Sequence, residues 1–154
     1  MEVYLVQHGE AKREEEDPAR ALTDRGKREA EGVARAAGRA GLALAEILHS
    51  GKRRAQETAE IFAVRLKPSR GVREAAGLAP MDDPAAAEGL IEGAAGPLML
   101  VGHLPHMGRL ASLLLAADPG KEIIAFRMGG IVCLSREEGG WRLRWMLTPE
   151  VAAG

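Results

Sequence analysis

The chain has 154 residues, of which 46% are hydrophobic, so it has enough apolar material for one folded core and is not a disordered chain. Its formal net charge is −1, which provides no overall positive field for nucleic acid or an anionic membrane surface. A single cysteine, Cys133, excludes a disulfide within the chain, and no apolar stretch has membrane-spanning length. We therefore expect one domain over residues 1–154, no nucleic-acid or membrane partner, and a cytoplasmic location.

The first predicted elements alternate between strand and helix. Val3–Val6 is a short apolar run typical of a buried strand, and Gly9 lets the backbone turn just beyond it. Residues 10–20 are charged and contain Pro18, which predicts a loop. Thr23 is a suitable N-cap for the helix that follows. This helix ends near Gly41 and has an apolar stripe formed by Ala30, Val33, Ala37 and Ala40.

The middle of the chain continues the alternation. Ile47–Leu48 marks a second strand, and Ser50 is placed to cap the helix after it. The apolar residues of this helix recur at helical spacing, at Ala55, Ala59, Phe62 and Leu66. Pro68 ends the helix, and Val72 favours a short third strand. Residues 75–96 are rich in Ala, Gly and Pro, which predicts a loop with one poor helix.

The last third of the chain begins with the clearest strand, Leu98–Val101, which ends at residues 102–105. A helix with apolar leucines follows and ends at Pro119-Gly120. Three strand-like segments close the chain, 121–127, 130–136 and 141–147, with paired glycines between them that are typical of hairpins. On the last segment, Trp141 and Trp145 are expected to pack on one face.

This order of elements predicts an α/β fold. We expect a three-layer sandwich with a mainly parallel central sheet, helices on both faces and antiparallel C-terminal strands. Three segments rich in polar groups follow strands: His8 the first, Ser50–Arg54 the second, and His103 a later one. Ligands of open α/β sheets bind beyond the carboxyl ends of the strands, so these residues are expected to converge there.

The same residues carry a resemblance to a known family. Residues 7–11, Gln-His-Gly-Glu-Ala, resemble the Arg-His-Gly signature of the histidine phosphatase superfamily, which includes the phosphoglycerate mutases. Three further motifs resemble later motifs of the family and follow in the same order: Leu22-Thr23-x-x-Gly26, Ser50-x-x-x-Arg54-Ala55-x-x-Thr58 and Gly102-His103-x-Pro105. The short chain and the Gly-His-Leu-Pro form are similar to the small SixA-type phosphohistidine phosphatases.

The resemblance implies a metal-independent phosphatase without a cofactor. His8 would attack the phosphoryl group, since a neutral imidazole is a competent nucleophile near pH 7, and water would then hydrolyse the phosphohistidine intermediate. Arg54 would grip the phosphoryl oxygens, and His103 would stabilise charge in the transition state. The substrate would be a phosphorylated protein, or a small phosphorylated molecule. The further substrate-binding candidates are Gln7, Gly9, Arg20 and Ser50.

Two departures from the family pattern bear on activity. The first is Gln7, which stands where the family has Arg and supplies no charge, so Arg53, Arg20 or Arg13 would have to compensate. Arg20 is a good candidate because Arg20-x-Leu22-Thr23 also resembles the SixA type. The second is Gly77, which falls where larger relatives have a Glu general acid. Without an acid, alkyl phosphate esters should be poor substrates, whereas phosphohistidine loses a weaker base and needs less help.

Two alternative functions remain open. A phosphatase for small phosphate monoesters requires Glu10 or Glu74 close to His8. A non-catalytic module that binds phosphate or phosphohistidine is suggested by Gln7. The spacing His103-x-x-His106 invites a metal site, but no carboxylate or cysteine stands at ligand spacing, so no metal is expected.

Two observations concern the surroundings of the protein rather than its reaction. The acidic run of residues 14–17 predicts a solvated loop that can flank a basic partner. The chain lacks Asn and is rich in Ala, Glu and Arg, which favours a thermophilic source, although high genomic G+C content also favours Ala, Gly and Arg.

Overall fold

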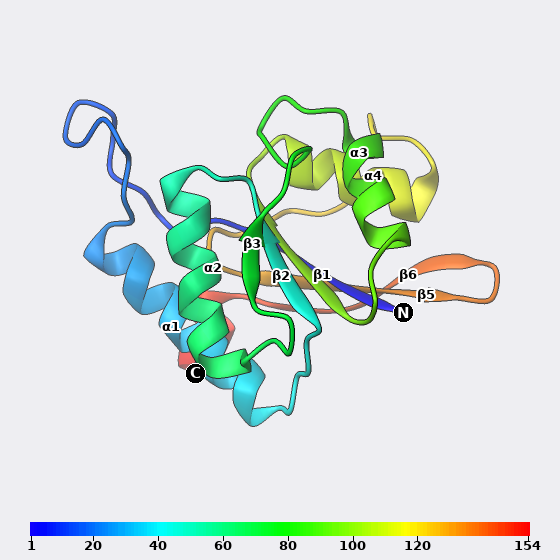
Figure 1. Cartoon of the computed structure of the whole chain (residues 1–154), viewed down its shortest axis with the longest axis horizontal. Helices are drawn as coiled ribbons and strands as arrows, with labels where there is room; N and C mark the ends of the chain where they lie inside the picture. The colour runs from blue at the N-terminus through cyan, green and yellow to red at the C-terminus, as the bar shows by residue number, and fades with distance from the viewer.

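The computed structural model describes residues 1–154 and contains one six-stranded sheet with helices on both faces (Figure 1). The elements are, in chain order, β1 (Glu2–Gln7), α1 (Asp24–Arg39), β2 (Glu46–His49), α2 (Arg53–Leu66), β3 (Val72–Glu74), α3 (Pro84–Glu92), β4 (Leu98–Gly102), α4 (His106–Ala116), β5 (Ile131–Glu137), β6 (Gly140–Leu147) and α5 (Pro149–Ala153). No helix is both long and apolar enough to cross a membrane.

The strand order is β3-β2-β4-β1-β5-β6. The first four of these strands run parallel, β5 pairs antiparallel with β1, and β6 pairs antiparallel with β5. This arrangement confirms the predicted α/β sandwich with antiparallel C-terminal strands. It also aligns the carboxyl ends of the central strands, since Gln7 of β1 is level with Gly102 of β4, and His49 of β2 is level with Val101.

Strand alternation divides the core between the two faces of the sheet. Tyr4 and Val6 face a cluster of 16 buried residues that includes those of α1 and α2. Val3 and Leu5 face a second cluster, of 15 buried residues, that includes those of α3 and α4. All five residues of β4 are buried, as expected for a central strand covered on both sides.

The first helix begins where the sequence predicts, but the second does not. Thr23 caps α1 by accepting a hydrogen bond from the Gly26 N–H at 3.0 Å, as predicted. The prediction that Ser50 caps α2 is wrong. The N-cap is Lys52, with no side-chain cap, because the helix begins two residues later than predicted and the Ser50 hydroxyl lies 2.6 Å from His103 Nε2.

The two weak predictions in the middle of the chain are confirmed. Val72 opens β3, a three-residue strand at the edge of the sheet. The poor helix within residues 75–96 is α3, which Asp83 caps by accepting a hydrogen bond from the Ala85 N–H at 2.9 Å.

The prediction of a strand over 121–127 is wrong. Both edges of β5 are occupied, one by β1 and the other by β6, so this segment cannot form the expected hairpin with β5. Its apolar residues Ile124 and Phe126 instead pack against the core cluster that α4 covers. The chain then ends in two antiparallel strands and the short helix α5, which the sequence did not indicate.

The expectation that Trp141 and Trp145 share one face is also wrong. The β5–β6 register shifts by one residue between Cys133 and Leu134, which reverses the alternation along β6. The Trp145 ring lies 6.0 Å from the Tyr4 ring on the α1 side of the sheet, whereas Trp141 packs against the cluster on the α4 side.

Candidate active site

Two histidines from distant parts of the chain lie side by side beyond the carboxyl ends of β1 and β4. Gln7 at the end of β1 pairs with Gly102 at the end of β4, so the next residues, His8 and His103, leave the sheet at the same level. The His8 backbone N–H donates to the Gly102 carbonyl at 3.0 Å. The two imidazole ring centroids are 5.0 Å apart, with the rings tilted by 53°. Both side chains are buried, with 9% of His8 and 1% of His103 exposed. Two imidazoles at this separation can contact the same phosphoryl group.

The hydrogen bond of His8 fixes which ring nitrogen is free. Nδ1 lies 2.7 Å from the carbonyl oxygen of Gly9. A carbonyl oxygen only accepts, so Nδ1 carries the hydrogen and Nε2 keeps an unprotonated lone pair in the neutral ring. The site therefore holds His8 in the tautomer that a nucleophile attacking through Nε2 requires.

Burial keeps both histidines neutral. The pKa of His8 is lowered to about 4, mainly by burial and in smaller part by the nearby cations Arg54 and Arg20, although the Gly9 carbonyl raises it. Burial lowers the pKa of His103 to about 3, with smaller contributions from His8 and Arg54. Near pH 7 the two rings are therefore uncharged, and a lone pair on His8 is available without a separate base to remove a proton.

Two arginines bring positive charge to these histidines. Arg54 is in the first turn of α2, and its buried Nε has no hydrogen-bond partner in the protein. Burial lowers the pKa of Arg54, and the charge of Arg20 lowers it further, so the two guanidinium groups lie within each other's field. Cations that converge without a carboxylate to neutralise them favour a bound anion.

Arg20 is held by the loop that follows β1. Its Nε donates to the Lys12 carbonyl at 3.0 Å, and its backbone adopts the left-handed conformation, with φ of 51°. The Asp17 carboxylate accepts hydrogen bonds from the N–H groups of Ala19 and Ala21, both at 3.0 Å. Asp17 thus organises the turn that carries Arg20 and is more than part of a solvated acidic run. An Asp side chain that accepts hydrogen bonds from backbone N–H groups a few residues later is typical of a turn.

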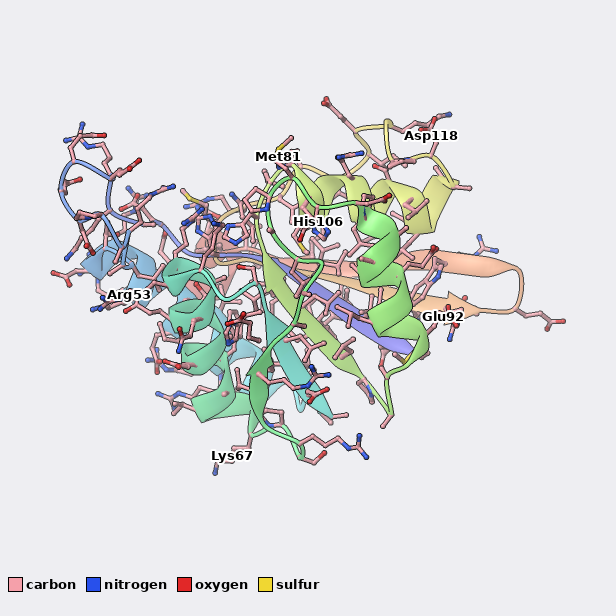
Figure 2. The ribbon with its side chains drawn as sticks, turned by 45° about the horizontal axis from the view of Figure 1, so that its top comes forward. Arg53, Lys67, Met81, Glu92, His106 and Asp118 are labelled. Atoms are coloured by element: carbon pink, nitrogen blue, oxygen red, sulfur yellow. The ribbon has the colours of Figure 1, made fainter.

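The other two candidate replacements for the missing Arg are paired with carboxylates. Arg53 pairs with Glu57 at 3.8 Å and lies on the outer side of α2 (Figure 2). Arg13 is exposed and pairs with Glu16 at 3.3 Å. Gln7 itself is half-buried and makes no side-chain hydrogen bond within the protein. Of the three arginines considered, Arg20 is the one whose charge reaches both His8 and Arg54.

Thr58 was not singled out as a site residue, yet it connects the main parts of the site. Its hydroxyl donates to the Arg54 carbonyl at 2.7 Å and accepts from the Gly9 N–H at 3.0 Å. The carbonyl of the same Gly9 holds His8 Nδ1. The side chain is fully buried. The spacing Arg54-x-x-x-Thr58 was a usable signal, because residues four apart share a helix face.

Gly9 and Ser50 have local structural roles. A Cβ at Gly9 would lie 3.1 Å from the Gly26 carbonyl oxygen, so a small residue is needed where the loop after β1 passes α1. The corresponding position on α1 is tighter, since a Cβ at Gly26 would lie 2.2 Å from the Glu10 carbonyl oxygen. The Ser50 hydroxyl, 2.6 Å from His103 Nε2, fixes the orientation of the His103 ring.

The nearest acidic candidates are engaged elsewhere. The Glu10 carboxylate accepts a hydrogen bond from the Thr23 hydroxyl at 2.8 Å. The Glu74 carboxylate packs beside Gly51, at the end of β3. The groups that shift the pKa of His8 and His103 are cations, histidines and a backbone carbonyl, with no carboxylate among them. A Cβ at Gly77 would lie 2.8 Å from the Ala86 Cβ, so the chain packs too closely there for any other residue.

His106 does not join the other histidines as a ligand set. It is fully buried at the start of α4, and both of its ring nitrogens lack a hydrogen-bond partner. No group of three or more His, Cys, Asp or Glu side chains is arranged to hold a metal ion.

Comparison with known proteins identifies a family for the sequence. The sequence model of the histidine phosphatase superfamily (branch 1) matches residues 3–82, which include His8 and Arg54 but not His103. A search of curated protein sequences gave no match.

Solved structures share the fold over nearly the full chain. The protein histidine phosphatase SixA, solved with tungstate, has a TM-score of 0.84 and 24% identity over 97% of each chain. A SixA-type protein from Agrobacterium tumefaciens has a TM-score of 0.77 and 25% identity over 96% of this chain and 97% of its own. A phosphoserine phosphatase from Entamoeba histolytica, solved with phosphoserine, has a TM-score of 0.72 and 16% identity over 97% and 98% of the two chains.

Proposed function

The chain belongs to the histidine phosphatase superfamily, and from this premise we propose that it hydrolyses phosphohistidine with His8 as the nucleophile. The observation that carries the proposal is a neutral, oriented His8 beside His103 and two arginines, with no carboxylate oxygen within 4.0 Å of a ring nitrogen of either histidine. These groups suit transfer of an anionic phosphoryl group to nitrogen, a reaction that depends on positioning and positive charge.

In the first step, the Nε2 lone pair of His8 attacks phosphorus and the phosphorus–nitrogen bond of the substrate breaks. The other nitrogen of the substrate ring takes a proton from solvent before attack, so the bonding electrons leave with a neutral imidazole. Water then attacks the phosphohistidine formed on His8 and releases orthophosphate, which regenerates the neutral ring. The Gly9 carbonyl keeps the hydrogen on Nδ1 throughout, and the positive charge that the ring gains while phosphorylated is dispersed toward that carbonyl.

Arg54 and Arg20 would neutralise the phosphoryl oxygens, and His103 would contribute a hydrogen bond from a buried, oriented ring. The unpartnered Nε of Arg54 and Nδ1 of His103 support these roles, because a buried polar group without a partner is costly unless a ligand satisfies it. Gln7 would add a neutral donor beside His8.

The absence of an acid near the rings favours phosphohistidine over an alkyl phosphate. An alkoxide leaving group needs protonation as it departs, whereas an imidazole is a much weaker base. Glu10 is bonded to Thr23 and Glu74 packs against Gly51, so neither is positioned as a donor. Small monoesters should therefore be hydrolysed more slowly than phosphohistidine.

The test is phosphate release in EDTA from a phosphohistidine peptide and from p-nitrophenyl and alkyl phosphates. We expect wild type to prefer the phosphohistidine peptide, and His8→Ala and His8→Gln to lose activity by on the order of a thousandfold or more. Circular dichroism checks that both variants are folded, and acid quenching of the reaction with labelled substrate should trap phosphate on wild type alone.

Other results would point to the alternatives. A preference for alkyl phosphates would indicate a small-molecule phosphatase. Tight phosphate binding without turnover of any substrate would indicate a binding module and contradict the proposal.

A further inference from the structure

A groove of about 710 Å³ opens next to the candidate active site. One wall is formed by residues of 104–109, where Leu104 and Pro105 directly follow His103, and the other by residues of 119–126. Figure 1 shows this second segment beyond the C-terminal end of α4, on the opposite side of the molecule from the loop that follows β1. The lining of the groove therefore begins at the residue that directly follows His103.

The wall formed by the 117–126 segment is held in place. The Ser112 hydroxyl donates to the Lys121 carbonyl, and the Asp118 carboxylate accepts from the Gly120 N–H at 2.9 Å. Ile124 and Phe126 are half-buried against the core, which gives the groove an apolar floor, while Leu104 remains 43% exposed at its edge. The groove is thus preformed, with apolar surface available for contact.

Unpaired positive charge gathers around this groove and the site. The cationic side chains without a carboxylate within 4.0 Å include Lys12, Arg20, Lys52, Arg54, Arg109 and Lys121. Two of them, Arg109 and Lys121, line the groove, and Glu122 leaves it one net positive charge.

We propose that the groove binds the polypeptide around the phosphorylated histidine of a protein substrate, through acidic side chains facing Arg109 and Lys121 and an apolar side chain on Leu104 and Phe126. This inference rests on the proposed function and names the partner as an acidic phosphoprotein segment. The phosphoryl group occupies the site at His8, and the groove beyond His103 is large enough for neighbouring side chains of the same segment. A free phosphorylated amino acid would leave it empty.

The test compares three substrates: a phosphohistidine peptide with acidic and leucine neighbours, the same peptide with lysines in place of the acids, and free phosphohistidine. We expect Lys121→Glu to lower kcat/KM for the acidic peptide about fivefold, because an attraction becomes a repulsion. It should leave free phosphohistidine unchanged and raise kcat/KM for the lysine peptide. Arg70→Glu is the matched control, since Arg70 is exposed and unpaired at the opposite end of the sheet.

A second variant blocks the groove without changing its charge. Gly108 lines the groove on α4, and a Cβ there meets only the Leu104 Cδ2, at 3.8 Å, so Gly108→Trp places a ring in open space. Gly89→Trp is its control, because Gly89 on α3 also has open space around it. We expect the first variant to lose activity on both peptides but not on free phosphohistidine, and the second to behave as wild type.

Binding of the unphosphorylated acidic peptide, followed by fluorescence anisotropy, tests the groove independently of turnover. Weaker binding by Lys121→Glu and Gly108→Trp than by their controls supports the proposal, even if wild type fails to hydrolyse free phosphohistidine and the proposed function fails. The proposal would be overturned if these variants bound the peptide as tightly as their controls, or if they affected peptides and free phosphohistidine equally. A change of oligomeric state in these variants would also overturn it, by showing that a second copy of the chain occupies the groove.

Discussion

The His8 imidazole is neutral because it is buried, and its hydrogen stays on Nδ1 because a carbonyl oxygen is the partner there. Its nucleophilic form therefore exists at neutral pH without a neighbouring base. Position 7 is Gln, so the site lacks the positive charge that an arginine there would supply. Arg20, whose charge lowers the pKa of both His8 and Arg54, is placed to supply it.

If Arg20 supplies this charge, Arg20→Gln should lower kcat/KM for phosphohistidine by about tenfold or more, as expected for loss of a charged donor in the transition state. Adding Gln7→Arg to that variant should restore part of the activity, because it returns a cation beside His8. Arg13→Gln, in the same loop but exposed and paired with Glu16, should have no effect. A double variant no more active than Arg20→Gln alone would show that the two positions do not share a role.

Two elements of the fold, β1 and α2, are joined by Thr58. Its hydroxyl bonds the Arg54 carbonyl within α2 and the Gly9 N–H beyond β1, so the helix that carries Arg54 is tied to the loop that orients His8. Thr58 is a positioning residue, acting on phosphate through the two groups that it connects. The close approach of Gly26 to the Glu10 backbone holds the same loop from the side of α1.

Replacing Thr58 with the isosteric Val removes both hydrogen bonds and leaves a buried N–H without a partner, which costs about 1–3 kcal/mol of stability. We expect kcat to fall more than KM changes, because the geometry of attack is disturbed while the cations remain. Thr58→Ser keeps the hydroxyl and should recover most of kcat. ¹⁵N NMR of the His8 ring would show whether its tautomer changes, and an unchanged kcat in Thr58→Val would contradict the positioning role.

For the whole molecule, keeping two neutral histidines buried makes stability depend on pH. The pKa values of His8 and His103 fall from 6.5 in the unfolded chain to about 4 and about 3 in the folded one. The unfolded state therefore binds protons first as the pH falls. The free energy of unfolding is unaffected by these groups above pH 6.5, and decreases from there until each folded pKa is reached.

As the pH falls from 7 to 4, each of these histidines decreases the free energy of unfolding by at most about 3 kcal/mol. Urea unfolding at pH 7.5, 6.0 and 5.0 measures the effect. His8→Gln has no titrating group at this position, so it should lose less stability than wild type over the same range. The same pH dependence in both proteins would show that His8 is not held neutral by the fold.

The sequence by itself determined the order of elements from β1 to α4 and the residues proposed for the site. Short apolar runs, helical spacing and cap residues act locally, so the strands around Val3–Val6 and Leu98–Val101 and the Thr23 cap were predictable. His8, Arg54 and His103 were found because each follows a predicted strand, and parallel strands bring their carboxyl ends together.

Only the tertiary structure decided which groups meet. Segment 121–127 forms no strand because β1 and β6 occupy both edges of β5, and a register shift there separates Trp141 from Trp145. Ser50 bonds His103 in place of capping α2, and the hydroxyl of Thr58 reaches Gly9 across 49 residues of sequence. These outcomes depend on strand pairing and side-chain packing between distant segments, which local pattern does not contain.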